Sequence, residues 1–213
     1  PALTRPKPNA HHSGTEIIIE RLKPEQRDWF ARAYNRINVS KQLGRVYSSM
    51  IGPAGNPVSF RLEINGNQVR PKLHCIWGGP DNPERTVETV RHGTINAFQP
   101  FDIRLDPRPF CLQCWNWLGA GQTACPSCAS AGTIVTRDRR VHGWLGIQRY
   151  LDRSDYGIDI LRNGRKIEVA NKDLFKWYDE AGDLEEIEYP IDDPRGRGRI
   201  VGEIHLDHCR VPY

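Results

Sequence analysis

The sequence contains no run of about 20 consecutive apolar residues, which is the length that a membrane-spanning helix needs. It also lacks the charged start and apolar core of a signal peptide. Hydrophobic residues make up 38% of the 213 residues, which is enough to form a core. We therefore expect a folded protein of one or two domains in the cytoplasm or nucleus, with no membrane partner.

No charge of one sign dominates the chain. Thirty Lys and Arg residues stand against 26 Asp and Glu residues, a net charge of +4 at pH 7. This balance permits contact with nucleic acid, but it is not that of a protein that coats DNA.

Several catalytic motifs are also missing: there is no G-x-S-x-G elbow, phosphate-binding P-loop, H-E-x-x-H pair or dinucleotide-binding glycine pattern. The most compact polar group is His205, Asp207 and His208. On a strand, His205 and Asp207 share one face and His208 lies on the other, which splits the group. Ordinary strand polarity is the favoured interpretation, and a hydrolase or nuclease site is a third, weaker hypothesis.

Cysteine is scarce, but its spacing is regular. Four of the six cysteines form two C-x-x-C pairs, Cys111 with Cys114 and Cys125 with Cys128. Two such turns supply the four thiolates of a tetrahedral zinc site, and four thiolates leave no open position for a substrate. Nothing suggests secretion, so disulfides are not expected. Redox chemistry needs only one pair. We predict a structural zinc ribbon over residues 105–135, bounded by Pro107, Pro109 and Gly132.

Aromatic and basic residues surround the ribbon. Aromatic rings among arginines can stack on and hold nucleic acid. In the favoured alternative, the tryptophans cover the small core of the ribbon and the arginines are solvated. The candidates for nucleic-acid binding are Trp115, Trp117, Arg139, Arg140, Arg165 and Lys166, although the last two are also typical of a solvated hairpin tip.

Hydrophobic periodicity and turn residues predict a mixed α+β architecture. Asn65-Gly66 and Asn163-Gly164 are typical hairpin turns. Residues 77–100 are expected to be loops with one weak strand or helix, and the acidic run from 179 to 193, followed by Arg195–Arg199, to be a solvated loop rather than a phosphate contact. The remaining predicted elements are a strand at 15–20, helices at 24–37 and 39–50, hairpin strands at 58–64 and 68–73, a strand at 141–150, hairpin strands at 156–161 and 165–169, a short helix or turn at 172–178, and a strand at 200–206.

The order of these segments resembles a known family. Residues 13–19 (SGTEIII), followed by two helices ending in residues 43–48 (LGRVYS), resemble the junction between the ATP-binding and transducer domains of GHKL ATPases, the superfamily of gyrase, MutL, the heat-shock chaperone ATPases and the MORC proteins. The hairpin at 160–167 (ILRNGRKI) and residues 198–206 (GRIVGEIHL) before Val211-Pro212-Tyr213 are most similar to a MORC-type transducer. The resemblance covers nearly the whole chain outside the ribbon.

The resemblance implies a transducer-like domain, a ribosomal-protein-like βαβ fold with hairpins, over residues 23–213, with the ribbon inserted in it. Residues 1–22 would be the terminal strand of an ATP-binding domain. Gly14 and Thr15 would match the element that approaches the nucleotide phosphates. The upstream nucleotide-binding boxes are absent, and the phosphate-sensing Lys would fall just after Tyr213. We therefore expect a fragment that is inactive alone, with ATP and magnesium bound only by the intact parent protein.

The leading hypothesis is a transducer portion of a MORC-like GHKL ATPase, which couples ATP-dependent conformational change or dimerisation to a task directed at DNA or protein. Its expected partners are its own ATP-binding domain, a second copy, and DNA or another protein. The alternative is a stand-alone zinc-ribbon module that binds nucleic acid. Arg45, at the end of the second predicted helix, either faces phosphate or pairs with an acidic neighbour.

Overall fold

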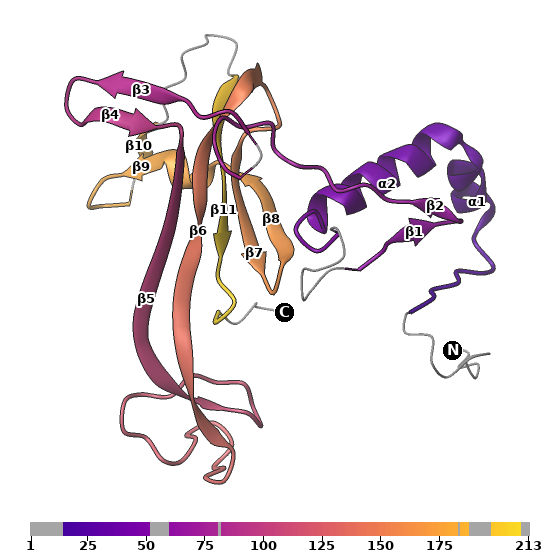
Figure 1. The fold of residues 1–213 in the computed structure, drawn as a ribbon. Helices are drawn as coiled ribbons and strands as arrows, with labels where there is room; N and C mark the ends of the chain where they lie inside the picture. Colours follow the sequence, from indigo (N-terminus) through magenta and orange to yellow (C-terminus); the bar gives the residue numbers. More distant parts are fainter. Residues whose placement is uncertain (1–14, 52–59, 81, 183, 188–196, 210–213) are drawn as a thin grey trace. The chain divides into compact units, whose positions relative to one another are not determined.

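The computed structural model describes residues 15–51, 60–80, 82–182, 184–187 and 197–209, and it is a mixed α+β protein (Figure 1). The chain divides into two units, Pro1–Val39 and Ser40–Tyr213. Within the described ranges, no helix is long and apolar enough to cross a membrane. Some predicted features lie outside the described residues. They are Gly14 in residues 1–14, part of the first hairpin in 52–59, the end of the acidic run with Arg195 in 188–196, and the last three residues in 210–213.

Two helices follow one another near the start of the described chain. Helix α1 (Pro24–Ala31) begins with a proline at its first turn, and α2 (Ala33–Val46) follows after Arg32, whose backbone is extended. Asn35 and Arg36 donate side-chain hydrogen bonds to carbonyls at the end of α1 and so satisfy groups that a helix end leaves unpaired. The prediction of two helices is confirmed, but the break lies at residue 32 rather than near 38.

The strand predicted at residues 15–20 is wrong. This segment pairs with no strand among the described residues, and its side chains are exposed, with Ile17 81% exposed. β-branched residues favour an extended backbone, but a strand forms only where a partner supplies the ladder of hydrogen bonds.

The main structural element is a five-stranded sheet in the order β5-β6-β11-β7-β8. All neighbours are antiparallel except β7 and β11, which are parallel. Parallel neighbours need a crossover connection, and the chain makes one between β8 and β11. The five strands are β5 (Phe98–Cys111), β6 (Ile134–Asp152), β7 (Gly157–Arg162), β8 (Arg165–Asn171) and β11 (Gly198–His205). The crossover includes the short 3-10 helix η1 (Asp173–Phe175), β9 (Lys176–Tyr178) and β10 (Leu184–Ile187).

Both predicted hairpins with Asn-Gly turns are confirmed. Strands β1 (Glu63–Ile64) and β2 (Asn67–Gln68) flank one turn, and β7 and β8 flank the other. The Asn and Gly of each turn have positive φ angles, 50° and 77° at Asn65 and Gly66, and 48° and 77° at Asn163 and Gly164. Asn and Gly tolerate this backbone region best, which explains why the sequence signal is strong.

The prediction for residues 77–100 is wrong. Strands β3 (Thr86–Thr89) and β4 (Gly93–Asn96) form a further hairpin there, and β5 begins at Phe98. Gly93 adopts a φ of 66° at the turn. The β-branched residues of 86–89 were a usable strand signal, which the surrounding glycine, proline and asparagine obscured.

Beyond the end of β11, the pairing of β5 with β6 continues without a third strand of the sheet among the described residues. The pairing of β11 with β6 ends at His205 opposite His142, whereas that of β5 with β6 continues to Cys111 opposite Ile134. Residues 103–111 and 134–141 therefore form a two-stranded extension of the sheet, which we call the arm (Figure 1). Pro107 and Pro109 lie within β5, beside a shift in register between Leu105 and Arg108, and proline is tolerated in such an edge strand.

Among the described residues of the second unit, two separate clusters of buried residues are found. One lies on the sheet and contains Ile76, Tyr156 and Val201. The other lies at the tip of the arm and contains Cys111, Leu118 and Cys125. The packing at the tip therefore shares no member with the packing on the sheet.

Candidate metal centre

The four paired cysteines lie at the tip of the arm, in two turns with the same backbone geometry. The N–H of Trp115 donates to the carbonyl oxygen of Cys111 at 2.9 Å, and the N–H of Ala129 donates to that of Cys125 at 2.8 Å. Trp115 and Ala129 both have positive φ angles, 61° and 56°. Each residue that directly follows a C-x-x-C pair thus turns the chain back in the same way.

A second hydrogen bond repeats in both turns. The N–H of Cys111 donates to the carbonyl of Asn116, and the N–H of Cys125 donates to that of Ser130, each at 2.9 Å. The two turns are therefore equivalent in their backbone hydrogen bonds, and their sulfur atoms face one centre.

The four sulfur atoms converge. All lie within 4.8 Å of one another, with 3.6 Å between the Sγ atoms of Cys111 and Cys128 and 3.3 Å between those of Cys114 and Cys125. Four sulfurs bound tetrahedrally at ~2.3 Å from one ion would be about 3.8 Å apart. The cluster is therefore compatible with a zinc site.

Backbone N–H groups favour the ionised form of one ligand. The backbone N–H of Cys114 lowers the pKa of Cys111 to about 6, against the opposing effect of burial. The side chain of Thr133 and the backbone N–H of Gln113 make smaller contributions in the same direction. The hydrogen bond with Cys125 raises the pKa of Cys114 to about 12, because it favours the neutral thiol. Crowded thiols thus share their protons unevenly, and a metal ion would replace those protons.

A small core supports the cysteines. Phe110 and Leu118 are buried, and the ring of Trp117 packs edge-on against Phe110 at 4.9 Å between centroids. Arg137 covers the Phe110 ring at 4.7 Å, and the indole N–H of Trp117 donates to the carbonyl of His208. Trp117 thus covers the core of the tip, as in the favoured interpretation. Trp115 remains 55% exposed.

The predicted nucleic-acid residues come from two parts of the second unit. Trp115, Trp117, Arg139 and Arg140 belong to the arm and its tip, whereas Arg165 and Lys166 belong to β8. Arg140 makes a double hydrogen bond to Asp102, at 2.7 and 2.9 Å. Arg165 lies over the ring of Tyr47 at 5.8 Å.

For Lys166, the structure corrects the prediction of a nucleic-acid contact. Its side chain is 1% exposed, and its ammonium group contacts the carboxylates of Asp159 at 2.6 Å and Glu203 at 2.9 Å. The expectation of a solvated hairpin tip is therefore wrong for this residue. The alternation of side chains along β8 turns Lys166 inward, where it does not offer its charge to a nucleic acid.

The inward carboxylate of Asp159 has further partners. It accepts hydrogen bonds from His74 at 2.9 Å and from the N–H of Ala170 at 2.7 Å. Burial by itself would raise the pKa of Asp159, but His74, Lys166 and the Ala170 N–H outweigh it and lower the pKa to about 2. His74, Asp159 and Glu203 lie close enough to hold a metal ion. The Lys166 ammonium already supplies a cation to both carboxylates, so the group forms a complete ion network.

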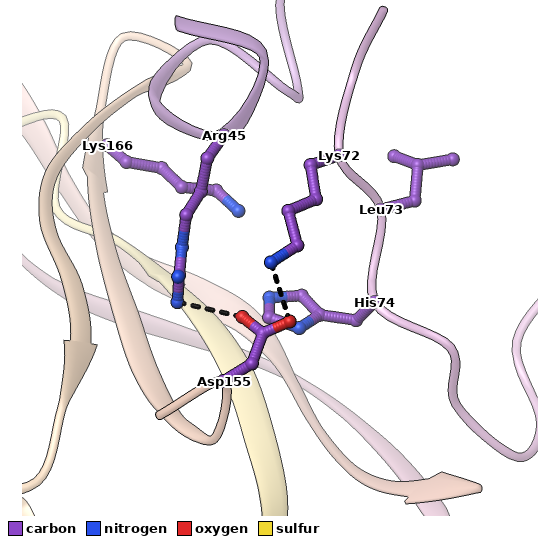
Figure 2. A pocket seen from close by; sticks show the side chains of 6 residues that line it. All are labelled: Arg45, Lys72, Leu73, His74, Asp155 and Lys166. Carbon is purple, nitrogen blue, oxygen red and sulfur yellow. Dashed lines mark ion pairs between the residues drawn. The ribbon is translucent and has the colours of Figure 1, made fainter. Parts of the chain in front are cut away.

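A second buried carboxylate lies beside this network (Figure 2). Asp155 pairs with Arg45 at 3.0 Å and with Lys72 at 2.7 Å. The alternative in which Arg45 pairs with an acidic neighbour is thus confirmed. These contacts join the end of α2, the segment after β2 and the turn between β6 and β7, so the shallow pocket that they line is a structural junction.

The structure shows a histidine group that differs in one residue from the group predicted from the sequence. His205 and Asp207 do lie together, but the third member is His142 of β6 rather than His208. His208 instead donates from Nδ1 to the carbonyl of Arg140 at 2.9 Å. Only the register of β6 and β11 brings His142 opposite His205, and the sequence holds no local signal for it.

No protein-family model matches this sequence, and no curated protein or solved structure matches it either. The fold and the site together define a mixed α+β protein with a five-stranded sheet and a four-cysteine cluster that is compatible with zinc.

Proposed function

We propose that Cys111, Cys114, Cys125 and Cys128 bind one zinc ion, which holds the tip of the arm in its folded form. The observation that carries this proposal is the repeated turn geometry, which directs four sulfurs to one point. Four protein ligands complete a tetrahedral shell and leave no position for a substrate, so the role of the ion is structural.

Metal analysis of freshly purified, reduced protein tests the site. We expect about one zinc ion per chain, lost in Cys111→Ser and in Cys125→Ser. Cys75→Ser is the matched control, because Cys75 lies outside the cluster and is exposed. Protein without zinc, or equal loss in the control, would contradict the proposal.

We further propose that residues 23–213 are the transducer portion of a MORC-like GHKL ATPase. The resemblance in segment order supports it, and so does one contact: the hydroxyl of Ser49, just after α2, donates to the carbonyl of Gly164 at the tip of the β7–β8 hairpin. In a transducer, this helix would lead from the ATP-binding domain, and such contacts would pass its movement to the sheet. The expected partners are that domain and a second copy.

The native gene on either side of this segment tests the transducer proposal. We expect an Asn-bearing acidic helix and Asp-x-Gly-x-Gly boxes upstream, and a Lys soon after Tyr213, in a protein that binds ATP with magnesium. In the intact protein, ATP should then slow hydrogen exchange in β7 and β8. A native frame without those boxes would remove the proposal and leave the zinc site unaffected.

A second candidate function is nucleic-acid binding by the arm. Two features favour it: the exposed ring of Trp115 at the tip, and the position of Arg108 directly opposite Arg137 across the strands. Like charges in such positions repel, and an anion between them would relieve the repulsion. We expect salt-dependent binding of single-stranded DNA that Trp115→Ala and Arg139→Ala weaken. Equal binding by Trp115→Ala would count against this function.

A further inference from the structure

Two histidines on neighbouring strands form an unusual pair. His142 of β6 lies directly opposite His205 of β11, and their rings are stacked, with centroids 4.6 Å apart and planes 9° from parallel. No hydrogen bond joins either ring to another residue in the described part of the chain. The pair lies at the last rung of the β6–β11 ladder, where β11 ends and the arm begins.

A carboxylate completes the group. Asp207 follows His205 by two residues, and its Oδ1 accepts a hydrogen bond from the N–H of Asn163 at 2.6 Å, which orients the side chain. Its Oδ2 lies 3.9 Å from Nε2 of His142. Each of the three residues offers one ligand atom within 4.8 Å of the other two.

The surroundings leave this group open to an ion. The side chains of His142 and Asp207 are 28% and 46% exposed, so a hydrated ion in solution has access to them. The positive charge closest along β6 is Arg140, which Asp102 neutralises through two hydrogen bonds. In the buried network of Asp159 and Glu203, by contrast, the Lys166 ammonium already acts as the cation.

We propose that His142, His205 and Asp207 bind a divalent first-row transition-metal ion, at a second site distinct from the cysteine cluster. Two imidazoles and one carboxylate suit zinc, cobalt or nickel better than magnesium or calcium, which prefer oxygen ligands alone. Three protein ligands leave at least one coordination position for water or an anionic group, unlike the closed shell of four thiolates. The site would therefore be able to bind an exchangeable ligand.

Cobalt binding to the zinc-loaded full chain tests the proposal. With zinc on the cysteines, we expect one further cobalt ion per chain, with visible d–d absorption and no thiolate-to-cobalt charge-transfer band. Binding of no further cobalt would overturn the proposal. Thiolate charge transfer with an equal release of zinc would also overturn it, because cobalt would then have entered the cysteine site.

Variants identify the ligands. His205→Ala and Asp207→Asn should each weaken cobalt binding at least about tenfold. Asp207→Asn keeps an oxygen that accepts the hydrogen bond from Asn163, and the residue is exposed, so this variant is expected to fold even if His205→Ala does not. His92→Gln, in the exposed turn between β3 and β4, is the control and should bind cobalt like the parent chain. Unchanged affinity in Asp207→Asn would overturn the proposal.

Discussion

Lys166 shows how strongly one inward side chain depends on its partners. Its ammonium group is enclosed between Asp159 and Glu203, and its neighbour Arg165 is exposed on the opposite face of β8. Enclosing a charge costs several kcal/mol in lost hydration, which its partners offset only while all of them are present.

Lys166→Met should therefore destabilise the chain by about 3–5 kcal/mol, because the buried carboxylate of Asp159 and the partly buried carboxylate of Glu203 lose their shared cation. Urea unfolding followed by circular dichroism measures this loss. Arg165→Met is the matched control and should cost about 1 kcal/mol or less, since it removes only an exposed charge over the Tyr47 ring. Equal losses in the two variants would show that Lys166 is not enclosed in solution.

The same network predicts an acid dependence of stability. The pKa of Asp159 is lowered to about 2 in the folded chain, against a value of about 3.9 when unfolded. The ionised carboxylate therefore contributes stability above about pH 4, and this contribution is lost as the pH falls towards 2.

Urea unfolding at several pH values tests this dependence. A chelator and a reductant are present throughout, so that protonation of the cysteines contributes equally to every variant. The decrease in the free energy of unfolding between about pH 4 and 2 should be smaller in Asp159→Asn than in the parent chain. Asp138→Asn, an exposed residue of the arm, should keep the parent slope. An unchanged slope in Asp159→Asn would contradict the assigned pKa.

At the scale of elements, the two cysteine turns depend on a backbone region that most residues avoid. Ala129 has a φ of 56°, which costs a residue with a Cβ atom about 1–2 kcal/mol. The hydrogen bond from its N–H to Cys125 requires this conformation, so the cost is part of the turn.

Ala129→Val should weaken zinc binding, because a β-branched residue fits this region worst, whereas Ala129→Gly should bind zinc at least as well as the parent chain. Competition with a zinc chelator measures the affinity of each variant. Weaker binding by the glycine variant than by the valine variant would contradict the turn geometry.

The close approach of β6 and β11 depends on a residue without a side chain. A Cβ atom at Gly143 would lie 1.8 Å from the backbone oxygen of Glu203, so one strand would have to move. Gly143→Ala should therefore lower the free energy of unfolding by about 3 kcal/mol or more. Gly132→Ala is the control, because nothing lies within 4 Å of its added Cβ, and it should change stability little. Similar stabilities of the two variants would contradict this packing.

At the scale of the whole molecule, the second unit has two independent centres of packing. The cluster on the sheet includes no residue of the arm tip, and the tip has only a few buried side chains besides its cysteines. So small a core cannot stabilise the tip without a cross-link, and small domains often use a metal ion for this purpose.

Removal of zinc should therefore unfold residues 111–134 and leave the five-stranded sheet folded. Hydrogen exchange followed by mass spectrometry should show rapid exchange at the tip after chelation, and unchanged protection in β7 and β11. Cooperative loss of protection across the whole sheet would contradict the independence of the two clusters.

The sequence by itself determined the features that depend on neighbouring residues. The Asn-Gly turns fixed two hairpins, and the C-x-x-C spacing fixed the membership of the cysteine cluster. In each case the backbone preference of a few adjacent residues selects the structure, and no distant contact is needed. The strand at 15–20 failed for the opposite reason, because pairing requires a partner that local preference does not supply.

Only the tertiary structure decided which distant residues meet. The insertion of β11 between β6 and β7 placed His142 beside His205 and Glu203 beside Lys166. Strand order and register are set by packing over the whole sheet, and a shift of one residue reverses the face of every side chain. The charge of Lys166 therefore looked exposed in the sequence and is enclosed in the fold, and the pair of histidines arose from segments that lie more than sixty residues apart in the chain.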